Sequence, residues 1–231
     1  MTDTTDDAPK PIPGREWIEP TTGSPFLWLD ALNLWVAKYQ VTNADFALYR
    51  PDHDSGEFQG MPLNTPRQPV AQVSYRDGSE FADWLTARDR QTGALETDQF
   101  FRLPSHREWT RFARCGDGRV YPWGNEWPPT RGNYGDAAAK RAFADWEAIP
   151  GYDDGHPVSC PVERAGENEW GLVGVGGNCY EWTFVADGTQ VELRGGSWST
   201  NQREYLRIDN AYRREPGSRL MNFGLRLVLV S

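Results

Sequence analysis

The sequence has few of the residues that build disulfide frameworks and metal centres. Its three cysteines are Cys115, Cys160 and Cys179. They are odd in number and form no CxxC pair, so they suggest neither a disulfide framework nor a zinc ribbon. Its three histidines are His53, His106 and His156. They lie far apart and match no HExxH pattern, so common zinc and non-haem iron sites have no local signature in this chain.

Basic charge and long apolar runs are also scarce. The 231 residues include 33 acidic and 24 basic side chains, which gives a net charge of −9 at pH 7. Phosphate binding requires a basic surface, so this balance argues against a nucleic-acid partner. No run approaches the roughly 18 apolar residues of a membrane span, so we expect no membrane partner.

The N-terminal segment differs in composition from the rest of the chain. It begins MTDTTDDAPKPIPG, which is acidic and lacks the apolar core of a signal peptide. We therefore expect a cytoplasmic location, with non-classical export as the open alternative. The polar, proline-rich composition predicts a disordered lead-in over residues 1–15. Residues 16–231 contain neither an internal repeat nor a linker, which favours a single domain.

Large aromatic residues and turn-forming residues are abundant. The chain contains 11 tryptophans, 23 glycines and 17 prolines. So many flat side chains exclude a disordered protein, because they supply ample apolar surface to bury. So many glycines and prolines predict that much of this core is covered by loops.

Three helices can be predicted from their start signals and their periodicity. Thr42 and Asp45 form a capping box before a short helix, and Ser105 and Glu108 form another. Between them, aromatic and aliphatic residues at helical spacing predict an amphipathic helix around residues 74–89. Strands are predicted from short apolar runs, at residues 26–29, 34–36, 191–194 and 225–229.

A long irregular stretch follows Gly116. For about 75 residues the chain is rich in glycine, proline, aspartate and tryptophan and shows no regular period. An irregular stretch of this length inside a compact domain must be held in place by other contacts. Buried tryptophans, backbone carbonyls and bound cations are the usual means.

Six short segments, taken in order, resemble the formylglycine-generating (sulfatase-modifying factor) family. The segments are KYQVTN at 38–43, RLPS with EW at 102–109, YPWGN at 121–125, GN with EW at 177–182, RGGSW at 194–198 and GLR at 224–226. They cover roughly residues 17–230. The resemblance implies an α+β fold of the C-type-lectin-like kind, loop-rich, with few helices, short antiparallel strands and calcium-braced loops.

The chain departs from this family at the residues that carry its chemistry. The family's copper-dependent oxidation of a sulfatase cysteine uses two cysteines just after the GGS segment, and Thr200 and Tyr205 occupy those places here. Neither supplies the soft thiolate that Cu(I) prefers, so we expect no copper and lean against an enzyme. An arginine of the family is also replaced, by Ala211. Cys179 is expected to be a buried structural thiol.

The resemblance also implies a structural calcium site. Its ligands map onto Asp136 and Asp154 and onto the backbone carbonyls of Ala137 and His156. Hard oxygen ligands from a loop suit Ca²⁺, although two aspartates that merely cap turns would give the same pattern. At the family's second calcium site Glu181 matches, but Gly174 replaces the usual ligand.

The segment between the GGSW motif and the final strand is suited to recognition. Residues 199–222 combine tyrosine and arginine with small polar side chains, a composition common in binding surfaces. In diversity-generating retroelements, a scaffold of this kind displays a variable segment at this place. The candidate ligand-binding residues are Ser199, Thr200, Asn201, Gln202, Arg203, Tyr205, Arg213, Arg214, Glu215 and Asn222. An ordinary solvated loop is the alternative.

These observations leave three hypotheses for function. The first is a non-catalytic scaffold that presents residues 199–222 to a protein or other macromolecular ligand. The second is a divergent metal-dependent oxidase that acts on a peptide or natural product, with a site formed by Tyr205, Arg207 and Cys179. The third is a subunit that braces a larger complex.

Overall fold

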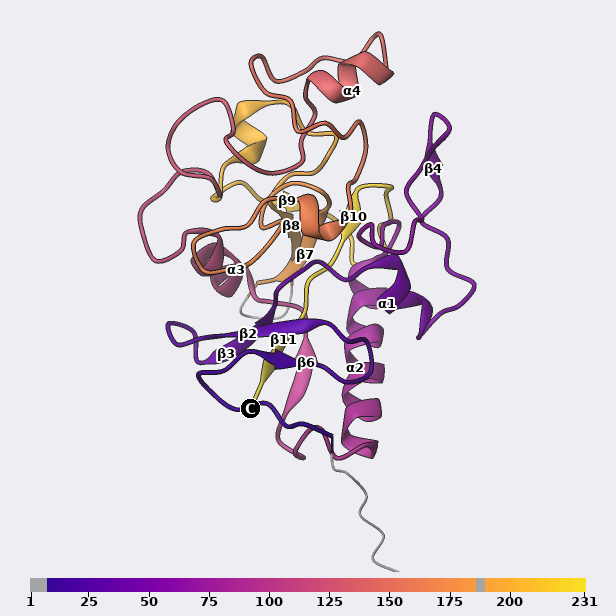
Figure 1. Ribbon diagram of the computed structural model, residues 1–231, viewed down its shortest axis with the longest axis vertical. Coiled ribbons are helices and arrows are strands. Elements are labelled where there is room, and N and C mark those ends of the chain that lie inside the picture. The colour runs from indigo at the N-terminus through magenta and orange to yellow at the C-terminus, as the bar shows by residue number, and fades with distance from the viewer. Residues whose placement is uncertain (1–7, 186–189) are drawn as a thin grey trace, which may run out of the picture.

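The computed structural model of the chain describes residues 8–185 and 190–231, and it places one long helix beside a central sheet (Figure 1). This sheet has five strands in the order β1-β2-β3-β11-β6. Its strands are β1 (Trp17–Ile18), β2 (Pro25–Leu29), β3 (Leu34–Ala37), β6 (Phe100–Arg102) and β11 (Val228–Val230). The apolar C-terminal strand β11 pairs antiparallel with β3 and β6, so the two ends of the domain are joined in one sheet.

A second sheet contains the end of the irregular stretch and the segments that follow it. It has the order β10-β7-β8-β9, with β10 parallel to β7 and the other pairs antiparallel. Its strands are β7 (Tyr180–Phe184), β8 (Val191–Arg194), β9 (Tyr212–Arg213) and β10 (Phe223–Gly224). A small hairpin pairs β4 (Glu57–Phe58) with β5 (Met61–Pro62).

The helices begin where the sequence placed capping residues. They are α1 (Asn43–Ala47), α2 (Tyr75–Gln91), α3 (His106–Ala113), α4 (Ala137–Ala142) and the 3₁₀ turns η1 (Val162–Arg164) and η2 (Arg203–Leu206). The predicted capping boxes at Thr42 and Ser105 are confirmed, and a third, formed by Ser74 and Asp77, starts α2. In each box a side-chain oxygen accepts a backbone N–H that the first turn leaves unpaired.

Two predicted elements differ from the structure. Helix α4 and strand β7 both lie in the stretch that we expected to be irregular. Asp136 caps α4 by accepting hydrogen bonds from two backbone N–H groups of its first turn. The predicted strand over 225–229 begins only at Val228. Before it, the carbonyls of Leu225 and Leu227 accept hydrogen bonds from Val41 and Ala37 without forming a regular ladder.

Large aromatic side chains form the core, as the composition predicted. Four tryptophans are almost completely buried: Trp35, Trp109, Trp182 and Trp198. The largest apolar cluster lies between the five-stranded sheet and α2, where Phe81 and Leu85 of the helix join Phe101 of β6. Fully burying a side chain of this size contributes about 1.5–3 kcal/mol to folding.

Residues 8–15 are in contact with this core. The Trp17 indole donates a hydrogen bond to the Pro9 carbonyl at 2.6 Å, and the Trp35 indole donates one to the Arg15 carbonyl at 3.3 Å. Our predicted lead-in over residues 1–15 lies outside the described residues over 1–7. Within the part of the chain that the structure describes, no helix is long and apolar enough to cross a membrane.

A pair of buried acids joins the β1–β2 turn to the end of α2. Glu19 and Asp89 are both fully buried. The Thr21 hydroxyl donates to Asp89 at 2.6 Å, while the second Asp89 oxygen, Oδ2, has no partner among the described residues. Burial, reinforced by the charge of Glu19, raises the pKa of Asp89 to about 7.

The pair makes stability depend on pH. Because the folded-state pKa lies above the ordinary value, the contribution of Asp89 is complete below about pH 4 and is lost as the pH rises through 7. Between about pH 5 and pH 8, the free energy of unfolding of wild type should fall by at least about 1 kcal/mol more than that of the Asp89→Asn variant. Urea unfolding at each pH measures both changes. The exposed Asp83→Asn change on the same helix is the control. Equal losses in wild type and Asp89→Asn would contradict the assignment.

Candidate functional site

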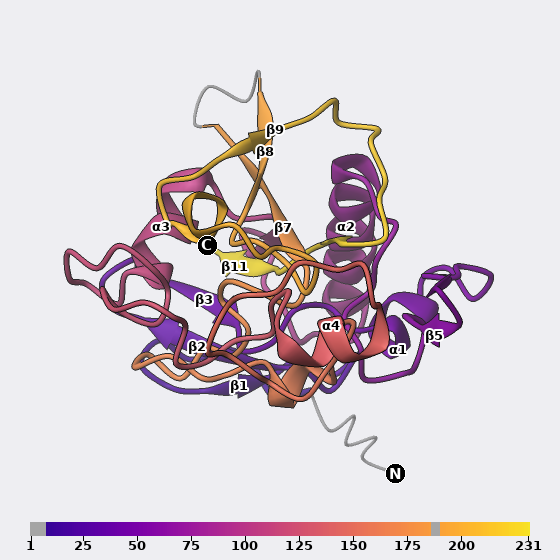
Figure 2. The same ribbon diagram turned by 90° about the horizontal axis from the view of Figure 1, so that it is seen from above.

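Residues 211–221, which we call the arc, form the most exposed part of the predicted recognition segment. Figure 2 shows the chain leaving β9 in a wide curve that passes α2 and returns to the centre of the molecule. One end is fixed because Tyr212 and Arg213 pair with Leu193 and Glu192 of β8. The other end is fixed near Arg219, which donates hydrogen bonds of 2.7 and 2.9 Å to Asp77 at the start of α2.

The recognition segment exposes apolar side chains to an unusual degree. Eight large hydrophobic side chains are exposed among the described residues, and four of them belong to this one segment. They are Tyr205 at 48%, Tyr212 at 37%, Leu220 at 47% and Met221 at 37% exposure. Clustered exposed apolar groups mark binding surfaces more often than isolated ones do.

A stack of side chains holds one arginine in place on the arc. The Arg214 guanidinium lies 3.7 Å from the centre of the Tyr212 ring, and Tyr212 stacks on Tyr180 with ring centres 6.0 Å apart. Among the residues that the structure describes, this guanidinium makes one hydrogen bond, a 3.3 Å contact from Nη1 to the Arg213 carbonyl. The remaining N–H donors are therefore oriented before a ligand arrives, which lowers the entropy lost on binding.

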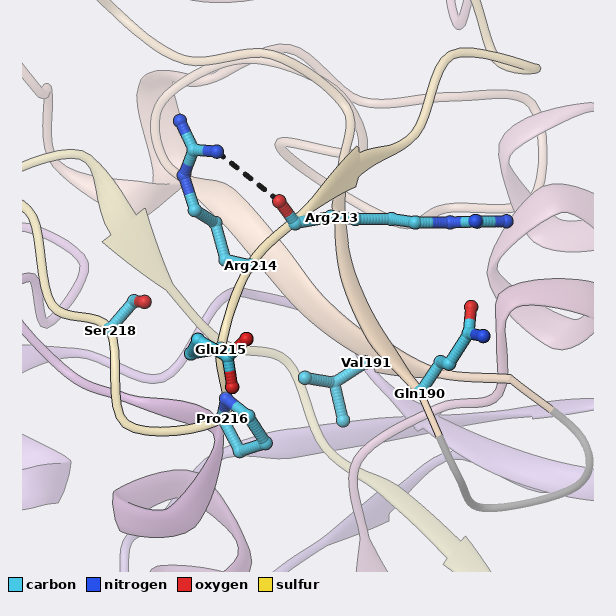
Figure 3. Close-up of a pocket in the computed structure, with 7 residues that line it drawn as sticks. All are labelled: Gln190, Val191, Arg213, Arg214, Glu215, Pro216 and Ser218. Carbon is cyan, nitrogen blue, oxygen red and sulfur yellow. Dashed lines mark hydrogen bonds between the residues drawn. The ribbon is translucent and has the colours of Figure 1, made fainter.

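The arc lines one side of an open pocket of about 470 Å³ (Figure 3). Its walls are Gln190, Val191, Arg213, Arg214, Glu215, Pro216 and Ser218. Figure 3 shows the two arginines extending in different directions from neighbouring positions. Arg213 has no ion-pair partner in the part of the chain that the structure describes. The pocket can accept a carboxylate or another forked hydrogen-bond acceptor.

Several residues that we predicted to bind a ligand instead support the surface. Thr200 is buried; its hydroxyl accepts a hydrogen bond from the Ser197 N–H and donates one to Tyr180 at 3.2 Å. Asn222 donates to the Ser199 hydroxyl at 3.0 Å. These contacts join the two ends of the recognition segment beneath the stacked tyrosines.

Of the other residues that we predicted to bind a ligand, some are hydrogen-bonded to the domain and others are exposed. Asn201 donates to the Glu147 carbonyl at 2.7 Å, and Arg203 donates to the Tyr121 hydroxyl at 2.7 Å while lying over the Trp127 ring. Gln202 and Glu215 are exposed. Sequence reasoning missed the pocket wall formed by Gln190, Val191 and Pro216, and it did not single out Tyr212, although the run YRR at 212–214 is a composition typical of binding sites.

The two aspartates of the expected calcium site lie together. The Asp154 N–H donates to Asp136, and Asp154 accepts hydrogen bonds from the N–H groups of Tyr134 at 2.9 Å and His156 at 2.8 Å. Neither carboxylate has an ion-pair partner among the described residues. Burial, together with the nearby charge of Asp136, raises the pKa of Asp154 to about 7. Ala137 is the first residue of α4, directly after Asp136.

The place of the second calcium site is occupied by an internal ion pair. Glu181 is fully buried and pairs with Arg226 at 2.9 Å. It also accepts hydrogen bonds from Gln40 at 3.0 Å and from the Trp109 indole at 2.8 Å. The guanidinium neutralises the carboxylate, so the residues present do not fit a cation here.

Comparison with known proteins agrees with this architecture. A family model described as the sulfatase-modifying factor enzyme 1-like domain matches residues 28–230. The chain belongs to this family. The inactive C-alpha-formylglycine-generating enzyme 2 of Bos taurus is 31% identical over 169 residues, which is 68% of this chain and 49% of that protein. The formylglycine-generating enzyme of Thermomonospora curvata is 34% identical over 148 residues, 62% of this chain and 40% of that protein. The chain thus spans about half the length, or less, of these relatives.

Two solved structures share the fold. PvdO from Pseudomonas aeruginosa superposes with a TM-score of 0.60 at 21% identity, over 90% of this chain and 81% of that chain. Treponema denticola variable protein 1 superposes with a TM-score of 0.62 at 18% identity, over 95% and 92% of the two chains. The predicted α+β, C-type-lectin-like fold of the formylglycine-generating family is therefore confirmed.

This family member has hydroxyl groups where the resemblance places two cysteines. The Thr200 hydroxyl donates a hydrogen bond to the Tyr180 hydroxyl. Burial raises the pKa of Tyr180, and the nearby Tyr205 raises it further by a smaller amount. Hydroxyl oxygens are harder donors than thiolates, so they are a poor match for Cu(I).

The oxidase hypothesis needs Tyr205, Arg207 and Cys179 in one site. Among the described residues, no hydrogen bond or ion pair joins any two of them. Cys179 is buried and packs against Gly224 so closely that an added Cβ at Gly224 would lie 2.9 Å from its Cβ. Burial raises the pKa of the Cys179 thiol, which lowers its reactivity. Tyr205 is exposed, and Arg207 pairs with Asp209 at 2.9 Å.

The burial of the thiols predicts their reactivity. We expect Cys160 and Cys179 to remain unmodified by a thiol reagent in native protein, while guanidinium-unfolded protein reacts at all three cysteines, because a buried neutral thiol is a poor nucleophile. Peptide mass spectrometry identifies the modified sites, and a Cys115→Ser variant removes the partly exposed thiol. Rapid native labelling of Cys179 would show an accessible site.

Proposed function

We propose that this protein is a non-catalytic binding scaffold that presents residues 199–222 to a protein ligand. The observation that carries the proposal is the arc. On a segment fixed at both ends, it exposes apolar side chains, Arg214 stacked on Tyr212, and Arg213, which has no ion-pair partner among the described residues. Rigid aromatic anchors beside oriented arginines are the chemistry of binding hot spots. The name of the bovine relative, an inactive enzyme, agrees with a family member that lacks catalysis.

We further propose that the arc is a variable surface of the kind found in diversity-generating retroelements. One neighbour in fold is titled a variable protein, although at 18% identity this likeness concerns the fold alone. A variable segment must change its side chains without unfolding the domain. The arc meets this condition because its exposed side chains lie outside the core, while Arg219 and the β8–β9 pairing hold its backbone.

Randomisation tests this proposal directly. A library varied at Arg213, Glu215, Leu220 and Met221 should yield mostly clones that melt within a few degrees of wild type, because surface changes alter stability by about 0.5 kcal/mol or less. A control library varied at the same number of buried positions should yield mostly unfolded clones. Those positions are Trp198, Thr200, Leu206 and Ile208.

The arc library should also yield binders when it is selected against a folded protein such as lysozyme. Replacing Tyr212 with alanine in a selected binder should weaken binding at least about tenfold, because the stack that orients Arg214 is lost. Arc clones that unfold as often as the control clones would contradict the proposal. So would a library that folds but gives no binder to any target.

The oxidase and the complex-subunit hypotheses make different predictions. Metal analysis of protein purified without chelator would find stoichiometric copper or iron in an oxidase and neither metal in a scaffold. Size-exclusion chromatography with the products of neighbouring genes would detect a structural subunit. A cytoplasmic location is part of our proposal, and cell fractionation tests it.

We also propose that Asp136 and Asp154 bind a structural Ca²⁺ together with the carbonyls of Ala137 and His156. The fully buried Asp136 carboxylate and the half-buried Asp154 carboxylate support this assignment, since neither has an ion-pair partner among the described residues. Bound calcium would neutralise both charges and would brace the irregular stretch on either side of α4. Burial favours the protonated form of Asp154. A bound cation would stabilise the ionised form instead.

Thermal melts with and without EDTA test the calcium site. Saturation at a hundred times the dissociation constant stabilises the fold by about 2.7 kcal/mol, or roughly 5–10 °C in Tm. The shift should grow between about pH 6 and pH 8, because calcium requires ionised Asp154, whose pKa without the cation is about 7.

The neighbouring aspartate provides a matched control. Asp154→Asn should abolish the calcium shift, because the amide carries no negative charge and offers one oxygen in place of two. Asp153→Asn, at an exposed residue paired with Arg141, should keep the calcium shift. A calcium shift that survives Asp154→Asn would place the ion elsewhere.

A further inference from the structure

Helix α3 carries three arginines along one face. Arg107, Arg111 and Arg114 stand at positions i, i+4 and i+7, which lie on the same side of a helix. They line a pocket of about 420 Å³ together with His106, Thr110, Gly116 and Asp117. This pocket shares no residue with the pocket of the arc.

The acids near this face are already paired with other arginines. Asp117 binds Arg119 at 2.8 Å, and Asp209 binds Arg207 at 2.9 Å. Within residues 8–185 and 190–231, no ion pair involves the three arginines of α3. The pocket therefore concentrates uncompensated positive charge in a chain whose net charge is −9.

Two buried nitrogen atoms at the pocket lack partners. The Nε of Arg114 and the Nδ1 of His106 are inaccessible to solvent and form no hydrogen bond among the described residues. Arg114 is always protonated, so its Nε–H is a buried donor without an acceptor, which costs free energy. A shift of the Arg114 side chain that brought Nε to an acceptor atom of a ligand in the pocket would remove that cost.

Helix stability does not explain the arrangement. Positive charge is favourable near the C-terminus of a helix, which accounts for Arg111 and for Arg114 at the C-cap. Arg107 lies in the first turn, where the helix dipole disfavours a cation. It also stands four residues from Arg111, a spacing at which like charges repel.

We propose that this pocket binds a small, multiply charged anion whose oxygens accept hydrogen bonds from the guanidinium groups of α3. Arginine forks match the oxygen spacing of both phosphate and carboxylate groups. The pocket volume suits a small molecule rather than a macromolecular surface. The site is separate from the arc, so the test of this anion site does not depend on the proposed scaffold function.

Titration calorimetry of the full chain tests the site with two probes, inorganic phosphate and tricarballylate, at about 150 mM NaCl to screen non-specific attraction. We expect one binding event per chain. Tighter binding of phosphate assigns the site to phosphorylated ligands, and tighter binding of tricarballylate assigns it to polycarboxylates. Binding of neither probe overturns the proposal.

Two double variants separate a specific site from general charge effects. Arg107→Gln with Arg111→Gln should weaken binding at least about tenfold, because two charge-assisted hydrogen bonds are lost. Arg76→Gln with Arg88→Gln removes the same charge from exposed positions on α2 and should change affinity by less than about twofold. Equal weakening in both variants would show that only net charge matters and would overturn the proposal. Circular dichroism confirms that each variant is folded.

Discussion

The ion pair between Glu181 and Arg226 is the contact on which the rest of the structure depends. Both side chains are fully buried, and Arg226 also donates to the carbonyls of Ala37, Lys38 and Val173. The pair thereby connects the end of β3, the irregular stretch, β7 and the C-terminal segment. Removing one partner of such a pair costs about 3–5 kcal/mol, because the other charge is left buried without compensation.

This network explains how a loop-rich chain can hold a fixed surface. Gln40 and the Trp109 indole bind the same carboxylate, so α3 and the segment before α1 are held at one point. The second sheet grows outward from Glu181 through β8 to β9. Its outermost strand carries Tyr212, and from there the arc extends into solvent.

The recognition segment also lacks the two cysteines that the resemblance places in it. The two positions expected to hold cysteines instead carry Thr200, which is buried in a hydroxyl network, and Tyr205, which is exposed. Cys160, in the irregular stretch, and Cys179, directly before β7, are both buried, and burial raises the pKa of both thiols. The edge of the domain carries exposed arginine and tyrosine side chains, a composition common in binding hot spots.

The sequence by itself determined the local elements and the family. Capping boxes at Thr42 and Ser105 and the short apolar strands are encoded within a few neighbouring residues, so they could be predicted. The proximity of Asp136 and Asp154 followed from the resemblance rather than from any local signal. Only the tertiary structure decided that Thr200 is buried, that β8 and the arc form one pocket, and that Arg226 neutralises Glu181. These outcomes join residues that are distant along the chain, and such pairings depend on how the whole chain packs rather than on any local pattern.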